Sequence, residues 1–254
     1  MIKRVLFFGY GLLSYVIFLG TFLYAIGFVG NFGVPQSLDG PASGPLGISL
    51  AIDVGLLTLF AVQHSLMARK WFKAWWTKIV PKPIERATYV LFSSLALILL
   101  FVWWRPLSGV VWSVQDPIGR FVLRGLFAFG WGLILYSTFL INHFDLFGLR
   151  QVWRNLVGQP ESELRFTTPG PYRLVRHPLY VGWLFAFWMT PQMTLAHLLF
   201  SVAPTAYILL AIRFEERDLV REFGDTYEDY RRNVPMLVPS LKSSRQPSNI
   251  KVRS

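Results

Sequence analysis

The stretch GPYRLVRHPLYVGW (residues 170–183) is where a basic loop turns into an apolar helix, and it decides how the last third of the chain folds. Pro171 and Pro178 fix φ and disfavour helical geometry in the residues before them. We therefore expect Arg176 and His177 on a stiff loop, with a helix starting just beyond. The free N–H groups of that first turn and the arginine forks favour an anion. The same residue types are also typical of a helix end in the headgroup layer of a membrane.

The composition indicates a polytopic membrane protein. Of 254 residues, 53% are hydrophobic, 17% aromatic and 15% charged, which is too apolar for an ordinary soluble domain. The net charge is +11, but the basic residues alternate with long apolar runs, so membrane topology explains them better than nucleic acid does. The absence of cysteine excludes disulfides and thiolate chemistry, and four histidines without a metal-binding pair give no reason to expect a metal.

The expected fold is all-α: a polytopic membrane bundle of four transmembrane helices plus a C-terminal helical hairpin. The last run would be roughly 51 Å long as a helix at about 1.5 Å per residue, whereas two crossings need roughly 60 Å. One arm of the hairpin should therefore start partly inside the membrane. Asp53 and His64 are polar positions in the second span and should face the bundle interior. The expected spans and hairpin are residues 5–30, 47–68, 87–104, 121–142 and 179–212, the last broken at 190–192.

The lysines and arginines are distributed unevenly, and this predicts the orientation. Of the 25, 22 lie before the first span, in residues 69–86, in residues 143–178 or after residue 212. Because basic loops remain in the cytoplasm, we expect both termini and the site loop there, in a bacterial inner membrane. The expected units are a four-span bundle at 1–142, a cytosolic loop, hairpin and cofactor-binding region at 143–240, and a flexible tail at 241–254.

A second polar segment follows the expected hairpin. Seven of the fourteen acidic residues lie between positions 215 and 229, most of them in the pattern of a solvated helix face. Glu215 and Glu216 differ because they lie at the membrane edge, and about 100° separates them on a helix, so at most one points into a given pocket. Gly224 is a suitable helix stop, and Tyr227 and Tyr230 then share one face of a short helix. Arginines, a histidine, an edge carboxylate and aromatic rings suit a cofactor with a carboxylate and a positive centre.

The paired motifs GPYRxxRHPxYxGW and EExxLxxxFGxxYxxYxxxVP, within residues 170–239, resemble the isoprenylcysteine carboxyl methyltransferase family of membrane enzymes. The resemblance implies S-adenosylmethionine as cofactor, bound on the cytosolic side. Many relatives have an arginine immediately before the Val-Pro, whereas this chain has Asn233, which argues against a prenylated cysteine as acceptor. Carried over by position, the cofactor site comprises Tyr172, Arg176, His177, Pro178, Tyr180, Trp183, Glu215, Glu216, Tyr227 and Tyr230.

The segment INHFDLFGLRQVW (residues 141–153) is similar to one in the methanethiol S-methyltransferase branch, which implies a small thiol as acceptor. Methyl transfer requires the thiolate, and a histidine can remove the proton. Asn142, His143, Asp145 and Arg150 are the catalytic candidates. His143 and Asp145 are only two positions apart, so Asp145 can instead orient Asn142 or Arg150, and the group can equally cap the fourth span.

Three other functions stay open from the residues alone. A membrane reductase would use the arginines to bind NADPH. A methyltransferase could act on a larger lipid or isoprenyl acceptor. The third is a non-enzymatic membrane component, like the nitric-oxide-associated proteins that share the general motif.

Overall fold

The computed structural model describes residues 1–42, 44–160 and 166–240, so the tail expected at 241–254 lies outside the described residues. The described chain is mostly helical. Its elements are α1 (Ile2–Gly30), α2 (Leu46–Ala68), α3 (Lys70–Trp76), α4 (Lys82–Trp103), β1 (Val110–Ser113), α5 (Pro117–Leu140), α6 (His143–Leu146), α7 (Leu149–Val157), the 3₁₀ helix η1 (Gly170–Arg173), α8 (Pro178–Trp188), β2 (Gln192–Thr194), α9 (Leu195–Phe223) and α10 (Asp225–Asn233).

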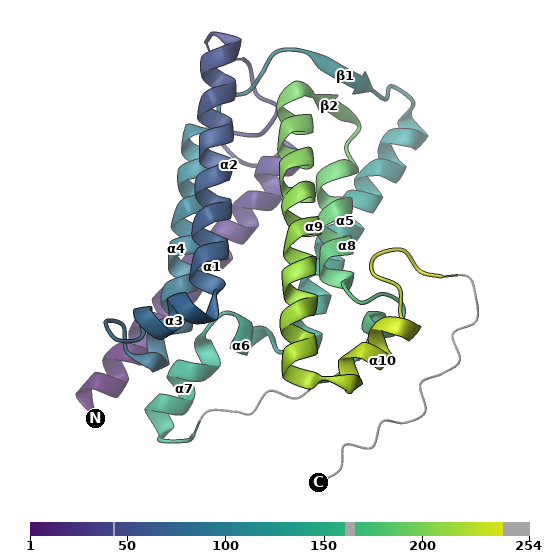
Figure 1. Cartoon of the computed structure of the whole chain (residues 1–254). Coiled ribbons are helices and arrows are strands. Elements are labelled where there is room, and N and C mark those ends of the chain that lie inside the picture. Colours follow the sequence, from purple (N-terminus) through teal and green to yellow (C-terminus); the bar gives the residue numbers. More distant parts are fainter. Residues whose placement is uncertain (43, 161–165, 241–254) are drawn as a thin grey trace.

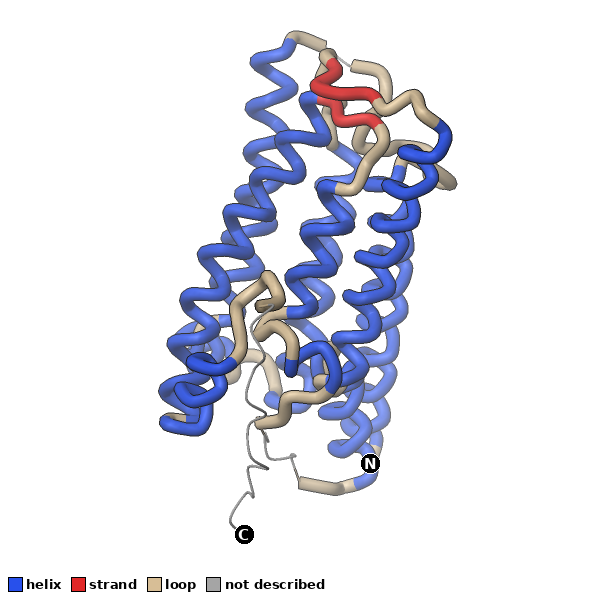
Figure 2. Tube along the Cα trace, turned by 90° about the vertical axis from the view of Figure 1, so that its right-hand side faces the viewer, coloured by secondary structure: helices blue, strands red, loops and turns tan. Residues whose placement is uncertain are grey.

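The long helices run side by side, and the short elements gather at the two ends (Figure 1). The N-terminus, α3, α6, α7 and α10 lie at one end, and β1 and β2 lie at the other. Figure 2 shows the strands and the N-terminus at these opposite ends. We call these the polar end and the strand end. Five helices, α1, α2, α4, α5 and α9, are long and apolar enough to cross a membrane, and α8 is a shorter apolar helix of 11 residues. The protein is therefore an integral membrane protein.

The strand pair corrects the expectation of a purely helical fold. β1 and β2 are antiparallel, with Val110 opposite Thr194 and Ser113 opposite Gln192. Each strand has four residues or fewer, too short to show a periodicity, and some 80 residues separate the two in sequence. The break expected at 190–192 is confirmed, since it lies between α8 and α9.

The apolar core sits toward the strand end. Phe28, Leu100, Trp104 and Phe200 are buried together, and the Trp104 indole N–H donates to the carbonyl of Leu38 at 3.2 Å. This core ties the loop after α1 to the α4 and α9 helices.

Two buried carboxylates fix the same end. Asp39 accepts hydrogen bonds from the Thr194 hydroxyl and from His197 Nδ1, the latter at 2.9 Å. Asp53 is fully buried and accepts from the backbone N–H of Arg105 at 2.8 Å, which confirms that it faces the interior. Buried carboxylates need such partners because an unpaired buried charge is costly.

Two glycines set the position of α8. A Cβ on Gly182 would lie 2.8 Å from the Gly130 carbonyl oxygen, and one on Gly130 would lie 2.7 Å from the Ala186 nitrogen. The backbones of α5 and α8 therefore touch directly, as small residues allow between membrane helices. Since α8 begins at Pro178, this contact fixes the place of the preceding Arg176–His177 loop.

The helix α9 is continuous from the apolar core to the polar end. Its first part is buried among aromatic residues, and its last turns carry Glu215 and Glu216. The helix ends at Gly224, whose φ of +54° favours glycine, and α10 follows. The expected stop and the expected short helix bearing Tyr227 and Tyr230 are both confirmed.

Candidate functional site

A buried ionic cluster joins the start of α8 to the end of α9. Glu216 Oε1 accepts from Arg176 Nε at 2.7 Å and from His177 Nε2 at 3.0 Å. The Arg176 and Glu216 side chains are only 11% and 12% exposed, and His177 is 5% exposed. Hydrogen bonds to charged groups are stronger in such surroundings than at the surface. We call these three residues the ionic cluster.

Arg176 also clamps the chain after α10. Its Nη1 donates to the carbonyls of Arg231 and Val234 at 3.0 and 2.7 Å. Its backbone N–H donates to Pro235 at 2.8 Å, and the next N–H, of His177, donates to Met236 at 3.2 Å. Much of the donor capacity of this arginine is thus spent within the protein, which makes it a positioning group as well as a local positive charge.

The second glutamate points elsewhere. Glu215 Oε2 accepts from the Tyr180 hydroxyl at 2.9 Å, and its side chain is 46% exposed. His177 Nδ1 is 4.0 Å from the same oxygen. The two neighbouring glutamates therefore have different partners, as expected from their separation on the helix. Glu215 is the carboxylate that a ligand can reach, and Glu216 is the one that the protein has already neutralised.

Tyrosines surround the cluster. Tyr227 is 1% exposed and Tyr230 8% exposed, and the Tyr230 hydroxyl donates to the Tyr172 carbonyl at 2.6 Å. Burial raises the pKa of Tyr172, Tyr227 and Tyr230, and the nearby glutamates add to the rise. These phenols are neutral at physiological pH, so they offer uncharged aromatic faces. Phe166, which sequence reasoning missed, packs against Phe223 and the two α10 tyrosines.

Two of the residues assigned to the cofactor site have mainly structural surroundings. Pro178 is fully buried and occupies the first turn of α8. Trp183 stacks on Phe187 at 5.4 Å and meets Trp131 edge-on at 5.3 Å, within the apolar core. The structure brings the other eight of the ten residues together at the ends of η1, α8, α9 and α10.

The segment 142–150 forms a separate polar group. Asp145 Oδ2 accepts from Asn142 Nδ2 and from Arg150 Nη1, the latter at 2.9 Å. Asn142 has a φ of +87°, which opens the turn between α5 and α6. Asp145 thus orients Asn142 and Arg150, while the ring nitrogens of His143 bind other partners. A pocket of about 470 Å³ beside α1 is lined by both Asn142 and Arg150.

His143 lies on the inner side of this turn with both ring nitrogens engaged. Nε2 is 2.9 Å from the Tyr15 hydroxyl, and Nδ1 is 2.9 Å from Thr138 Oγ1. The Thr138 hydroxyl donates its proton to the Leu135 carbonyl at 2.7 Å, so it can only accept from His143. Nδ1 therefore carries the hydrogen and Nε2 accepts from Tyr15, a partner that sequence reasoning missed. Burial lowers the pKa of His143.

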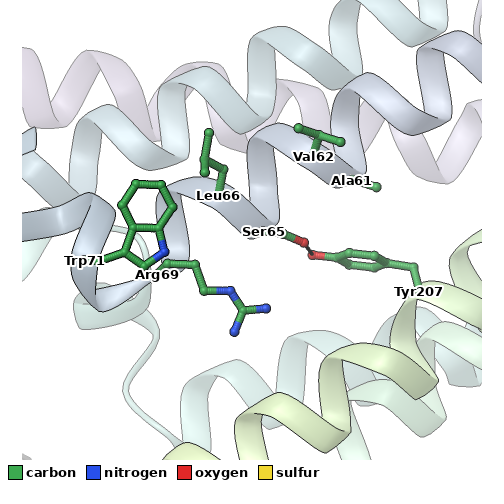
Figure 3. A pocket seen from close by; sticks show the side chains of 7 residues that line it. All are labelled: Ala61, Val62, Ser65, Leu66, Arg69, Trp71 and Tyr207. Atoms are coloured by element: carbon green, nitrogen blue, oxygen red, sulfur yellow. Dashed lines mark hydrogen bonds between the residues drawn. The ribbon is translucent and has the colours of Figure 1, made fainter.

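A second pocket, of about 480 Å³, opens between α2 and α9 (Figure 3). It is lined by four residues of α2, by Arg69 between α2 and α3, by Trp71 of α3 and by Tyr207 of α9. The Ser65 hydroxyl donates to the Tyr207 hydroxyl at 3.0 Å. The Arg69 guanidinium lies 4.4 Å from the ring centre of Phe214, the residue directly before Glu215. The pocket thus reaches the polar end of α9. No sequence motif marked it, because its walls come from segments about 140 residues apart.

Among the described residues, no group of three or more histidine, aspartate or glutamate side chains is arranged to hold a metal ion. Positive and negative groups instead pair with one another in the ionic cluster and around Asp145. The arrangement is suited to binding an organic ligand that carries both charges.

Comparisons with known proteins place the chain. It is 56% identical over 232 residues to the methanethiol S-methyltransferase of Crocosphaera subtropica, covering 91% of each chain. It is 52% identical to that of Mycobacterium tuberculosis, covering 93% of this chain and 97% of the relative. Nurim of Sus scrofa is a more distant relative, 34% identical over 68% of each chain.

No family model and no solved structure matches the sequence. The similarity to these two relatives nevertheless extends over more than nine-tenths of the chain. The chain belongs to the methanethiol S-methyltransferase family.

Proposed function

We propose that this protein is a membrane methyltransferase that transfers the methyl group of S-adenosylmethionine to methanethiol and so forms dimethyl sulfide. The observation that carries the proposal is the ionic cluster with Glu215 beside it, at the polar end of an apolar helical bundle. The similar proteins are named methanethiol S-methyltransferases. An apolar, volatile thiol enters a membrane readily, whereas a charged cofactor needs a polar site at its edge. The structure has both surroundings in contact along α9.

The residues around the ionic cluster suit S-adenosylmethionine by their charges and their aromatic rings. S-adenosylmethionine supplies a methyl group made electrophilic by a sulfonium charge. Glu215 is a reachable carboxylate, which suits the positive part of such a ligand. Arg176 adds a local positive charge that favours the ligand's carboxylate, while its donors and His177 Nε2 hold Glu216 and the chain after α10. The neutral rings of Tyr172 and Tyr180, which are only partly buried, can pack against a cation.

The chain's own residues then orient the reactants. Arg176, just before α8, holds the start of α8, the end of α9 and residues 234–236 as one unit. Its guanidinium binds Glu216 of α9 and the Val234 carbonyl, and the backbone N–H groups of residues 176 and 177 bind the carbonyls of residues 235 and 236. Pro178 and Trp183 support that unit from the apolar side, and Tyr230 ties α10 to Tyr172. A rigid site of this kind lowers the barrier by holding the reacting atoms in line.

We assign the segment 142–150 a positioning role. Asp145 fixes Asn142 and Arg150 beside the pocket next to α1, and His143 fixes Tyr15 on α1. As a direct base, His143 would need to receive the proton through Tyr15, because its one acceptor nitrogen already binds that hydroxyl. Its contribution to turnover then comes from holding α1, α5 and α6 together.

We also propose that four helices cross the membrane as full spans, α1, α2, α4 and α5, and that α8 and α9 form the hairpin, with the polar end in the cytoplasm of a bacterial inner membrane. The uneven distribution of basic residues supports this orientation, and the 11 residues of α8 support an arm that starts inside the membrane. A reporter fused after Ser254 should be active only in the cytoplasm. Activity in the periplasm would refute the orientation.

The activity is tested by incubating membranes that contain the protein with methyl-labelled S-adenosylmethionine and a panel of thiols, followed by headspace analysis. We expect labelled dimethyl sulfide from methanethiol and less product from longer thiols. Transfer of label to a lipid instead would show a larger acceptor. Binding of NADPH without binding of S-adenosylmethionine would refute the proposal in favour of a reductase.

A further inference from the structure

We propose that the pocket between α2 and α9 binds one anionic phospholipid, with its phosphate on the guanidinium groups of Arg69 and Arg217 and one acyl chain along α2. The proposal goes beyond the proposed methyl transfer, because it adds a lipid site that does not depend on the reaction. It starts from two arginines that contact one aromatic ring and have no acidic partner.

The two guanidinium groups meet on the ring of Phe214 at the polar end. The guanidinium carbon of Arg69 lies 4.4 Å from the ring centre, and that of Arg217 lies 5.6 Å from it. Among the described residues, no carboxylate forms an ion pair with either group, and no oxygen accepts a hydrogen bond from either. The ring attracts both cations but accepts no conventional hydrogen bond from their N–H groups. Two such forks in one place are complementary to a phosphate.

The acidic side chains nearest in sequence to Arg217 are engaged by other basic residues. Glu222 Oε2 lies 3.1 Å from Lys70 Nζ, and Asp218 Oδ1 lies 3.7 Å from Arg221 Nη1. Glu215 and Glu216 have the partners described above, in and beside the ionic cluster. The charges of Arg69 and Arg217 are therefore left for an anion from outside the described chain.

The pocket continues from Arg69 along an apolar wall. Ala61, Val62 and Leu66 of α2 form this wall, and the last two side chains are exposed on the outside of the protein. From residue 61 to residue 69 the wall is roughly 12 Å long at about 1.5 Å per residue. Both α2 and α9 are long and apolar enough to cross a membrane. The wall therefore faces hydrocarbon, and an acyl chain is the occupant that such surroundings supply.

A hydroxyl pair lies next to the arginine in the same pocket. The Ser65 hydroxyl donates to the Tyr207 hydroxyl at 3.0 Å, and no described oxygen accepts the proton of Tyr207 itself. Ser65 and Arg69 are four positions apart, roughly 6 Å along a helix at about 1.5 Å per residue. Figure 3 shows Arg69 extending toward α9 on the side where Tyr207 meets Ser65. Since the ester carbonyls of a glycerophospholipid follow its phosphate, Tyr207 is placed to donate to one of them.

The residue types at the polar end of the pocket are those of the headgroup layer. Trp71 lines the pocket there and is exposed, and Trp75 on the same short helix is exposed as well. Tryptophan is enriched at membrane–water interfaces, and basic pockets between membrane helices bind anionic headgroups. A phosphate at Arg69 thus leaves the acyl chain pointing along α2 into the bilayer.

Other occupants use only part of this arrangement. A small thiol can lie against the apolar wall, but it has no group for two guanidinium forks. A soluble phosphate has such a group, but it leaves the wall without a partner. A zwitterionic lipid brings a cationic headgroup, which the two arginines repel. An anionic phospholipid satisfies the arginines, the Tyr207 hydroxyl and the apolar wall together.

A lipid in this place joins two helices. It contacts Arg69 at the end of α2 and Arg217 on α9, and the ring between their guanidinium groups belongs to the residue directly before Glu215. A ligand that binds only the folded protein raises its unfolding temperature. We therefore expect anionic lipid to stabilise the protein against heat through these two arginines.

The test is native mass spectrometry of the full-length protein in detergent micelles, titrated with phosphatidylglycerol or with phosphatidylcholine of the same acyl chains. We expect one phosphatidylglycerol to bind roughly ten- to thirtyfold more tightly than phosphatidylcholine, as two basic residues near a headgroup predict. Arg69→Gln and Arg217→Gln should each lower its affinity by about ten- to hundredfold, because charge-assisted hydrogen bonds are lost. Tyr207→Phe should lower it by about two- to tenfold, as for one neutral hydrogen bond.

Lys78→Gln is the matched control. It removes one positive charge from an exposed side chain at the same end of the protein but outside the pocket, so phosphatidylglycerol should bind it as it binds the wild type. Each variant is compared after its unfolding temperature without added lipid has been measured. Arg217 is exposed, so Arg217→Gln carries the test even if Arg69→Gln does not fold. Arg69→Lys keeps the charge without the fork, and its affinity should lie between those of Arg69→Gln and the wild type.

A second readout is the unfolding temperature in the same micelles. Phosphatidylglycerol should raise it in the wild type and in Lys78→Gln, and should raise it less in Arg217→Gln. The proposal is overturned if phosphatidylcholine binds as tightly as phosphatidylglycerol, or if Lys78→Gln weakens binding as much as the arginine variants do. Equal binding of glycerol 3-phosphate, which has no acyl chain, would also overturn it. None of these measurements requires methyl transfer, so their outcome is separate from that of the proposed function.

Discussion

Replacing Glu216 with glutamine removes the negative charge at the centre of the ionic cluster while keeping the length of the side chain. Glu216 Oε1 accepts two hydrogen bonds, from Arg176 at 2.7 Å and from His177 at 3.0 Å. Both partners of the arginine pair are close to nine-tenths buried, so water cannot replace the lost charge. The substitution leaves a buried guanidinium without its counter-ion.

The magnitude follows from that geometry. Removing one partner of a buried ion pair costs about 3–5 kcal/mol, and a single hydrogen bond to a charged group is worth about 1.5–3 kcal/mol. The glutamine oxygen can still accept one hydrogen bond from the Arg176 guanidinium, so we expect Glu216→Gln to lower the free energy of unfolding by about 2–4 kcal/mol. Because Arg176 also holds residues 234–236, the start of α8 should loosen at the same time.

Glu215→Gln is the matched control on the adjacent position. Its side chain is 46% exposed and accepts one hydrogen bond, from Tyr180, which an amide oxygen can also accept. The stability loss should stay under about 1 kcal/mol, as for exposed charges. Affinity for S-adenosylmethionine should instead fall by roughly ten- to hundredfold, because the reachable carboxylate is lost.

Equilibrium unfolding in mixed micelles and calorimetric titration of S-adenosylmethionine measure the two effects separately. The reasoning is refuted if Glu216→Gln is as stable as the wild type, or if Glu215→Gln is the more destabilised of the two. Unchanged cofactor affinity in Glu215→Gln would refute its assignment as the ligand-facing carboxylate.

Two further predictions concern the scaffold. Gly130→Ala should cost about 1–3 kcal/mol of stability through overpacking against α8. Gly132→Ala on the same helix, with nothing within 4 Å of the new Cβ, should be neutral or slightly stabilising. Equal unfolding temperatures for the two variants would contradict the close contact of α5 with α8. Burial lowers the pKa of His143, so the unfolded chain binds a proton there more readily than the folded chain does. The stability that this histidine contributes is therefore present above about pH 6.5 and declines as the pH falls below it. His143→Gln should show a weaker decline between pH 7 and pH 5 than the wild type in the same unfolding assay, and parallel curves would show that the lowered pKa is not expressed.

Much of the candidate site could be predicted from the sequence because its residues lie in two short motifs with local rules. Proline at the start of α8, the 100° between Glu215 and Glu216, and the stop at Gly224 are all properties of the chain over a few residues. Asp145 similarly meets Asn142 and Arg150, which are three and five positions away. Contacts of this range follow from helix and turn geometry.

The partners of the histidines could not be predicted in that way. Tyr15 reaches His143 across 128 positions, and Ser65 meets Tyr207 across 142. The strand pair and the second pocket likewise join segments that are about 80 and 140 residues apart. An apolar helix offers many equivalent faces to its neighbours, so its hydropathy does not say which face meets which helix.

The sequence by itself therefore determined the membrane class, the apolar helices and the composition of the donor site, since hydrophobicity and backbone rules act locally. The tertiary structure alone decided which glutamate is neutralised and which stays accessible, and that His143 has both ring nitrogens engaged. The physical reason is that these outcomes depend on the rotation and register of packed helices, which the close contact of Gly130 with Gly182 and the long-range hydrogen bonds fix together.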